Sequence, residues 1–240
     1  MPDLRDDQKL SRQENYAQLL SLAVHEFRGP ASIINGYLRM LQRDNDPPLS
    51  ERQLKMIDEA VKSCARMVGM VAEMSEIGKL DSGELVLARQ PLDLFTIVAE
   101  VAELVHEAKD REVHLKADGA DHGASIFGDA PRLRTAFDAL FRTILREKPG
   151  PATVLADRRV VSRDGRTCAV VVISEAASVQ DAYDREPGPF NEKTGGVGLA
   201  LPLARRVIES HGGRLWSPKA IEENDPLTRG SAIVSLPITE

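Results

Sequence analysis

The stretch "LAVHEFRGPASII", residues 22–34, decides the fold of the N-terminal part, because it combines a heptad pattern with a helix-breaking proline. Apolar residues spaced alternately by four and three form the seam of a helix that packs lengthwise on another helix. On this seam His25 takes an outward position, and Pro30 follows about one turn later, where an interior proline costs ~3 kcal/mol. The seam residues are Leu20, Val24, Phe27, Ala31, Ile34, Leu38 and Leu41.

A second helical pattern follows a short break. "RDNDPPLS", residues 43–50, contains two prolines, which end the first helix. Ser50 and Gln53 have the spacing of a capping box, which predicts the start of the next helix. The two amphipathic helices predict an αα-hairpin, and two such hairpins from two chains form a four-helix bundle, so we expect a homodimer. The second seam consists of Leu54, Ile57, Val61, Cys64, Val68 and Val71.

The C-terminal part has a mixed pattern that predicts an α+β sandwich, with helices on one face of a sheet. An Asp164-Gly165 pair predicts a hairpin turn between two β-rich runs. We expect a dimerisation and histidine domain over residues 1–80, a linker over 81–90, and a second domain over 91–240. Helices are expected at 91–109, 129–146 and after the glycine-rich loop at 194–201, and strands at 111–117, 152–161, 167–174 and 231–238.

Composition narrows the classes of function. The chain has 240 residues and a net charge of −6, which argues against nucleic acid or an anionic membrane surface as the main partner. No apolar run approaches the ~20 residues of a membrane span, and the N-terminus is too polar for a signal peptide. Two cysteines without metal-ligand spacing indicate a reducing compartment. We therefore expect a cytoplasmic protein, or the cytoplasmic piece of a larger one.

The residues beside His25 suit a phosphoryl acceptor. Glu26 is adjacent and can deprotonate an imidazole, as a histidine nucleophile requires. Arg28 adds a positive charge that suits an incoming phosphoryl group. After these residues, Ser32, Asn35 and Arg39 lie on the flank of the helix that we expect a partner to contact, although a merely solvated face explains them equally well.

The six residues "HEFRGP", 25–30, resemble the phosphoacceptor box of the two-component sensor histidine kinases. The resemblance implies a dimerising helical hairpin followed by a GHKL-type, ATPase-like domain. It further implies that His25 accepts a phosphoryl group and passes it to an aspartate on the receiver domain of a response regulator. In this comparison Glu26 is the base, and Arg28 completes the set of three catalytic residues.

The resemblance extends to the family's asparagine box, over "GDAPRLRTAFDALFRTILREKPG", residues 128–150. Ala139 and Thr143 stand where the family has its two asparagines, the second of which ligates magnesium. Thr143 is thus the implied metal position, with a hydroxyl that is a weaker anchor than a carboxamide oxygen. Arg146 stands at the family's lysine position and keeps a charge that suits phosphate.

Two further boxes of the family differ in how well this chain matches them. Ser174 stands where the family has an aspartate that accepts a hydrogen bond from adenine, and Ala176 and Ser178 replace the glycines that follow. The glycine loop before the last helix is retained, and helix-terminal amides of this kind hold phosphate. The residues that the resemblance implies for this loop are Gly195, Gly196, Gly198 and Leu199.

These replacements argue against binding of the implied cofactors, ATP and Mg²⁺, and three hypotheses remain. The first is a two-component protein whose His25 exchanges phosphoryl groups with a response regulator, with weak or absent autokinase activity. The second is a divergent but active ATP-dependent sensor histidine kinase that uses Thr143 and Arg146. The third is a dimeric adaptor without enzymatic activity. The sequence leaves open whether the chain is an enzyme, either a histidine protein kinase or a phosphotransferase.

Overall fold

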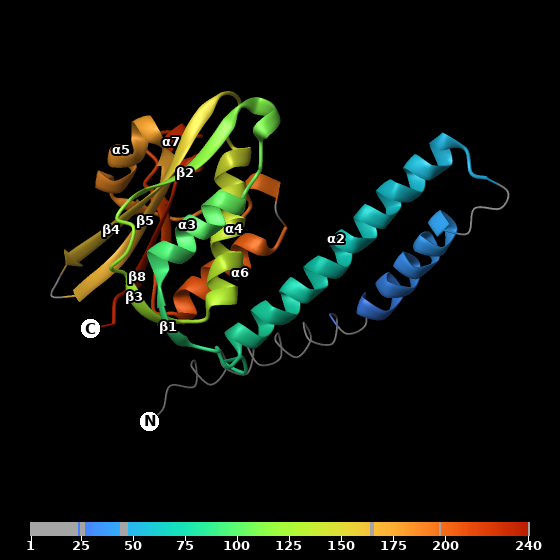
Figure 1. Ribbon diagram of the computed structural model, residues 1–240, viewed down its shortest axis with the longest axis horizontal. Helices are drawn as coiled ribbons and strands as arrows, with labels where there is room; N and C mark the ends of the chain where they lie inside the picture. The colour runs from blue at the N-terminus through green and yellow to red at the C-terminus, as the bar shows by residue number, and fades with distance from the viewer. Residues whose placement is uncertain (1–23, 25–26, 44–47, 164–165, 197, 240) are drawn as a thin grey trace. The chain divides into compact units, whose positions relative to one another are not determined.

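The computed structural model describes residue 24 and residues 27–43, 48–163, 166–196 and 198–239 (Figure 1). The chain divides into two compact units, Met1–Leu85 and Val86–Glu240. The described part of the first unit forms a pair of helices, and the second unit is a sheet with helices on its faces. The predicted fold class, a helical hairpin followed by an α+β domain, is confirmed.

The first unit consists of a helix over residues 27–43 and α2, Glu51–Asp81. The predicted capping box at the start of α2 is present. The Ser50 amide donates to Gln53 Oε1 at 2.9 Å, and the Gln53 amide donates to Ser50 Oγ at 3.4 Å. Among the described helices, none combines the length and the apolar character that a membrane-spanning segment requires.

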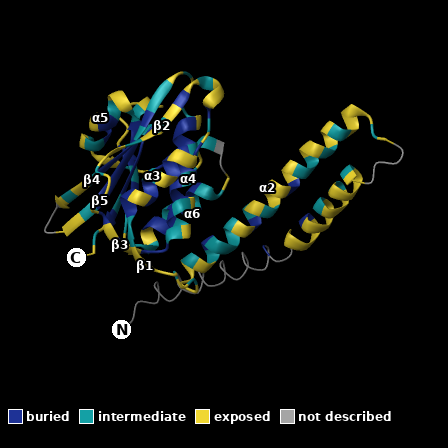
Figure 2. Ribbon diagram, viewed as in Figure 1, coloured by how far each residue is buried: buried dark blue, intermediate teal, exposed yellow. Residues whose placement is uncertain are grey.

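Among the described residues of the first heptad seam, two are buried, Leu38 is half-buried, and three lie open. Val24 and Ala31 are each 5% exposed, and the Cys64 thiol of α2 lies 3.0 Å from the Ala31 carbonyl oxygen. The alternate seam residues lie open along the helix over 27–43, which is largely exposed in Figure 2. These open positions are Phe27, Ile34 and Leu41, which are 64%, 49% and 50% exposed.

The second unit is built on a six-stranded sheet in the order β2-β4-β5-β8-β7-β6, with a separate antiparallel pair of β1 and β3. Among the strands in the described residues, β2 and β4 are the only parallel neighbours. The strands are β1 Gln90–Asp93, β2 Val113–Gly119, β3 Ser125–Gly128, β4 Ala152–Arg163, β5 Arg166–Glu175, β6 Pro187–Gly188, β7 Arg214–Pro218 and β8 Ala232–Pro237. The helices are α3 Leu94–Leu104, α4 Ala130–Arg146, α5 Val179–Asp184, α6 Ala200–Ser210 and α7 Pro226–Arg229, with short 3₁₀ turns η1 Lys109–Arg111, η2 Ala176–Ser178 and η3 Thr194–Gly196.

The predicted helix at 91–109 is shorter in the structure. Its first residues instead form β1, which pairs with β3, and α3 begins only after Asp93. The Asp93 carboxylate accepts a hydrogen bond from the Phe95 amide at 2.8 Å, which fixes the helix start. The predicted turn at Asp164-Gly165 lies outside the described residues, but β4 and β5 pair on both sides of it, with Arg163 opposite Arg166.

Helices cover both faces of the large sheet (Figure 1). α3, α4 and α6 lie on one face, and the short α5 lies on the other. β5 is apolar on both faces, as is typical of a strand covered on both sides. The expectation of helices on one face only is therefore wrong, because α5 covers the other face and buries a second cluster there. This cluster consists of Val170, Val172, Val179, Ala182 and Ile233.

A half-buried histidine joins the start of α4 to the end of α6. His211 Nε2 accepts a hydrogen bond from the Asp129 amide at 2.9 Å. The proton must therefore be on Nδ1, which lies 2.6 Å from the Val207 carbonyl oxygen. The Asp129 carboxylate in turn caps α4 and accepts a hydrogen bond from the Ala88 amide at 3.0 Å. The contacts of this one imidazole thus tie the two helices together.

We predict that acid weakens this junction. Burial lowers the pKa of His211 below its ordinary value of 6.5, and nearby Arg89 and Arg132 act in the same direction, against Val207 and Asp129. The unfolded chain therefore binds more protons near pH 6, so the stabilising contribution is complete above pH 6.5 and is lost as the pH falls through the folded-state pKa. Urea unfolding between pH 7.5 and 5.5 should show a smaller loss of stability for His211→Gln than for the unsubstituted protein. A control variant at the exposed His106, His106→Gln, should behave like the unsubstituted protein, and equal pH dependence in all three would contradict the prediction.

Candidate functional site

The predicted site residues fall in four places: the hairpin, α4, the end of β5, and the glycine loop with the start of α6. In the hairpin, Arg28 is exposed in the helix over 27–43. His25 and Glu26, the predicted nucleophile and base, lie outside the described residues. Pro30 is also exposed and lies within the helical residues.

α4 presents a buried stripe and a flank of predicted site residues. The helix is capped by Asp129 and has a proline in its first turn. Its apolar stripe is buried, with at most 1% of each residue exposed: Leu133, Phe137, Leu140 and Ile144. These contacts fix the direction in which the flanking positions point.

Thr143, the implied metal position, is completely buried. Its hydroxyl donates to the Ala139 carbonyl oxygen at 2.8 Å, one turn earlier in α4. Its other side is covered by Gly195, where an added Cβ would lie 2.7 Å from Thr143 Cγ2. The hydroxyl therefore has no open side towards which a metal ion could approach in this arrangement.

Arg146 is engaged by protein groups on both sides. Its Nε lies 3.0 Å from Glu107 Oε1, and its Nη1 donates to the Gly195 carbonyl oxygen at 3.1 Å. The hydrogen bond from Arg146 lowers the pKa of Glu107, while burial acts in the opposite direction. Arg146 thus connects α4 to the glycine loop directly.

Ser174, the residue at the adenine position, is also enclosed. Ser174 Oγ and Ser231 Oγ are 2.7 Å apart, and both serines are 0% exposed. The Ser231 carbonyl oxygen accepts a hydrogen bond from Ser217 at 3.0 Å. Ser174 is therefore part of a buried hydroxyl pair between β5 and the start of β8.

The glycine loop is held in place from several directions. Gly195 and Gly198 have φ values of +68° and +71°, which non-glycine residues rarely adopt. The Gly195 amide donates to Glu147 Oε1 at 3.2 Å. Gly196 ends η3, and Leu199 precedes the first turn of α6, where its carbonyl oxygen accepts from the Leu203 amide at 3.0 Å.

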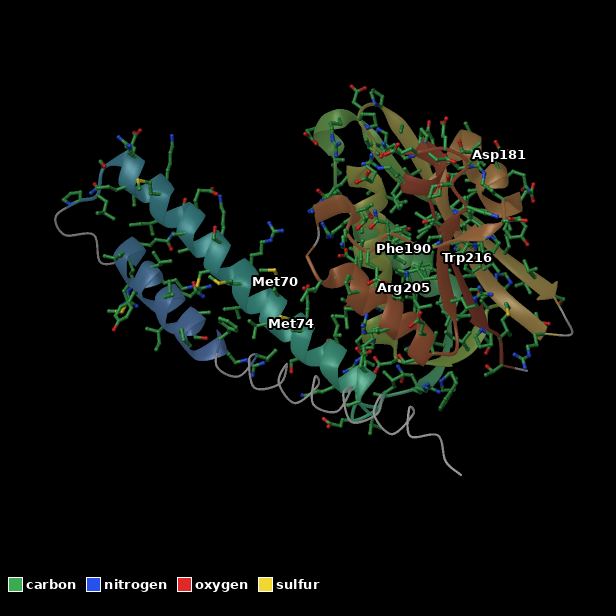
Figure 3. The ribbon with its side chains drawn as sticks, turned by 180° about the vertical axis from the view of Figure 1, so that it is seen from behind. Met70, Met74, Asp181, Phe190, Arg205 and Trp216 are labelled. Atoms are coloured by element: carbon green, nitrogen blue, oxygen red, sulfur yellow. The ribbon has the colours of Figure 1, made fainter. Side chains whose placement is uncertain are left out.

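The segment before the loop is attached to α6 by Arg205. Its guanidinium donates to the Phe190 carbonyl oxygen at 3.1 Å and forms an ion pair with Glu192. Phe190 itself is only 7% exposed, and Figure 3 shows it beside Arg205. The chain from Phe190 to Gly195 is therefore anchored at both ends.

Charged residues that the sequence did not indicate complete this region. Glu107 contacts Arg146 and Glu147 contacts Gly195, whereas Arg229 contacts Glu147. Their partners are distant in the chain, since Arg229 and Glu147 are 82 residues apart. No periodicity or motif marks them, so only the packed structure reveals them.

We tested whether a magnesium–nucleotide complex fits these residues. The Thr143 hydroxyl donates to Ala139 in a side chain that is 0% exposed and whose methyl side faces Gly195, and the Ser174 hydroxyl faces Ser231. In this arrangement the two side chains do not fit such a complex. Within the described part of the chain, no three His, Cys, Asp or Glu side chains gather in a way that would hold a metal ion.

The hairpin unit carries the "HEFRGP" box, and the sheet unit carries the glycine loop. Residues 16–83 match the model of the His Kinase A (phospho-acceptor) domain. The chain is homologous to the sensor histidine kinases, and residues 16–83 are its HisKA domain.

Curated relatives support this assignment over most of the chain. It is 22% identical over 231 residues to the sensor protein VanS of Enterococcus faecium. This alignment covers 92% of this chain and 57% of VanS. The chain is 25% identical over 229 residues to the signal transduction histidine-protein kinase BaeS of Escherichia coli. This alignment covers 89% of this chain and 45% of BaeS. The chain thus spans about half the length of these two relatives.

Solved structures share the fold. Full-length ShkA in complex with AMPPNP superposes with a TM-score of 0.65 at 18% identity, covering 92% of this chain and 45% of ShkA. The histidine kinase ThkA in complex with the response regulator TrrA gives a TM-score of 0.57 at 18% identity, covering 100% of this chain and 68% of ThkA. At this level of identity the likeness establishes the fold alone.

We predict that Gly195→Ala destabilises the second unit. The left-handed backbone alone costs roughly 1–2 kcal/mol for an L-residue, and the new methyl group would overlap Thr143. Gly150 is a matched control in the same unit, because an added Cβ there meets nothing within 4 Å. Urea unfolding should show a loss for Gly195→Ala and little change for Gly150→Ala, and equal stability of the two variants would contradict the predicted contact.

Proposed function

We propose that the chain is a dimeric two-component signalling protein whose His25 exchanges phosphoryl groups with an aspartate of a response regulator, while its own use of ATP is weak or absent. One contrast carries the proposal. The HisKA domain retains the "HEFRGP" box in full, whereas the hydroxyls of Thr143 and Ser174 are engaged inside the protein.

The proposed reaction is a transfer between aspartate and histidine. The unprotonated ring nitrogen of His25 attacks the phosphorus of an aspartyl phosphate on the receiver domain. A nitrogen–phosphorus bond forms, the phosphorus–oxygen bond to aspartate breaks, and a free carboxylate leaves. The proton on the other ring nitrogen passes to Glu26, and Arg28 offers positive charge to the transferred group. The same steps in reverse phosphorylate the receiver.

Two observations support a response regulator as the partner: the polar flank of the hairpin, and the complex in which one structural neighbour was solved. ThkA, whose fold this chain shares, is a histidine kinase solved in complex with a response regulator. In this chain Ser32 and Arg39 are exposed on the helix that follows the phosphoacceptor box, and Asn35 is half-buried. We propose that this flank of the hairpin contacts the receiver domain.

The leading alternative is a divergent kinase that still phosphorylates itself with ATP. ShkA, solved with AMPPNP, shares the fold, and Arg146 keeps a positive charge beside the glycine loop. An ATP-dependent reaction would require the loop to move away from Thr143, because Gly195 covers that residue. A non-enzymatic dimeric adaptor is the second alternative.

We predict that His25 acquires label from a phosphorylated receiver domain and acquires little or none from ATP with Mg²⁺. Labelled receiver and labelled ATP are supplied in separate incubations, followed by detection of acid-labile phosphate on the chain. His25→Ala should abolish all labelling, while the control His106→Ala, at an exposed histidine of the other unit, should label normally. Strong labelling from ATP would favour the divergent kinase, and no label from either donor would favour the adaptor.

We also predict that the open half of the first seam forms the dimer interface. Ile34 is 49% exposed on the seam, and Ile33 beside it is 60% exposed at a position outside the seam. Burial of an isoleucine contributes about 1.5–3 kcal/mol, and each dimer contains two copies. Ile34→Lys should therefore raise the dimer dissociation constant at least ~100-fold, as measured by light scattering over a dilution series. Ile33→Lys is the control, and an equal effect of both variants would contradict the assignment of the interface.

A further inference from the structure

The Glu147 carboxylate lies at the junction of three segments of the second unit. Glu147 follows α4 directly, and its side chain is 15% exposed. Oε1 accepts a hydrogen bond from the Gly195 amide of the glycine loop at 3.2 Å. Oε2 accepts one from Arg229 Nη2, at the end of α7, at 2.8 Å. Both carboxylate oxygens therefore face donors from other parts of the chain.

This position is electrostatically unusual for a carboxylate. The C-terminus of a helix carries a partial negative charge, so cations are favoured there and anions are disfavoured. Glu147 is the residue that ends α4, next to Arg146. Its contacts with the Gly195 amide and Arg229 compensate for this unfavourable place.

The donors around Glu147 form the kind of set that binds an anion. An amide at a left-handed glycine and an arginine guanidinium are both typical ligands of phosphate oxygens. A pocket of about 430 Å³ opens beside them, which is within the range of small-molecule sites. Besides Glu147, Gly195 and Arg229, its lining includes Asn191, Lys193 and Thr228.

From this arrangement we propose that the pocket is an anion site that the chain fills with its own Glu147 carboxylate, and that it binds a small phosphate-bearing molecule only when this carboxylate is withdrawn. We call it the Glu147 anion site. It deepens the proposed function and rests on it, because an internal anion on the glycine loop accounts for weak nucleotide binding. The incoming phosphate oxygens would take the Gly195 amide and the Arg229 guanidinium, and Lys193 would add positive charge.

The Ser174–Ser231 hydroxyl pair and the Thr143 hydroxyl are not part of this site. Neither Ser174 nor Thr143 lines the pocket. Thr143 contacts Glu147 only through its backbone, since its carbonyl oxygen accepts a hydrogen bond from the Glu147 amide at 3.2 Å. Phosphate recognition at the Glu147 anion site therefore requires neither an adenine acceptor nor a metal anchor. It depends on the positive charges of Arg229 and Lys193 and on the Gly195 amide, and this chain has all three.

The test is a binding titration with inorganic pyrophosphate, without metal, on the whole chain. Glu147→Ala empties the position, and Glu147→Gln neutralises it while keeping its size, so that at least one variant folds for the comparison. By calorimetry, both should bind pyrophosphate at least tenfold more tightly than the unsubstituted protein, with the alanine variant the tighter of the two. The double variant Glu147→Ala with Arg229→Ala should lose the gained affinity.

Glu175→Ala is the matched control for the change in charge. Glu175 pairs with Lys148 at 3.4 Å, next to Glu147 in the chain, but it does not line the pocket. The Glu175→Ala variant should bind pyrophosphate with the same affinity as the unsubstituted protein. The proposal is overturned if Glu175→Ala gains as much affinity as Glu147→Ala, if neither Glu147 variant gains any, or if the unsubstituted protein already binds as tightly. Because the readout is binding of pyrophosphate, such a failure leaves transfer from the receiver to His25 untouched.

Discussion

Gly195 lies so close to α4 that a Cβ in place of its hydrogen would come within 2.7–3.0 Å of three Thr143 atoms. This contact requires a glycine with a left-handed backbone, and the sequence supplies one. With Gly195 seated there, its amide reaches Glu147 and its carbonyl oxygen reaches Arg146. The enclosure of Thr143 and the position of the glycine loop follow from this one close approach.

The electrostatics of the region follow from the same placement. Arg146 is shared between Glu107 and the loop, and Glu147 is shared between the loop and Arg229. Ion pairs at partly exposed positions contribute little stability individually, with a typical value of ~0–1 kcal/mol. Their effect here is geometric, because each pair holds a side chain that also forms a hydrogen bond with the Gly195 backbone. A ligand that opened the loop would have to separate several of them together.

The hairpin presents the opposite situation, with apolar surface that its own partner helix leaves open. The seam residues Val24 and Ala31 pack inside, whereas Phe27, Ile34 and Leu41 remain exposed. A stripe of large apolar side chains at heptad spacing is costly in water and is typical of a surface that another helix covers. The proposed dimer interface, receiver contact and phosphoryl acceptor all lie in this unit, whereas the glycine loop lies in the second unit.

Much of the fold could be predicted because its signals are local and periodic. Heptad spacing gave the hairpin, the Ser50 and Gln53 pair gave the start of α2, and the apolar stripe of α4 gave its buried face. Residue order also identified the boxes of the site, including which polar positions differ from the family. Each of these inferences needs only neighbours within a few turns of helix or along a strand.

The tertiary structure alone decided which residues meet across the chain. Ser174 is 57 residues from Ser231, Gly195 is 48 residues from Glu147, and Arg229 is 82 residues from Glu147. Such pairs leave no period in the sequence, because they depend on how the helices and strands pack and not on local backbone preference. For the same reason the heptad spacing predicted the seam as a whole. The packed hairpin alone showed that Val24 and Ala31 are buried while Phe27, Ile34 and Leu41 are open.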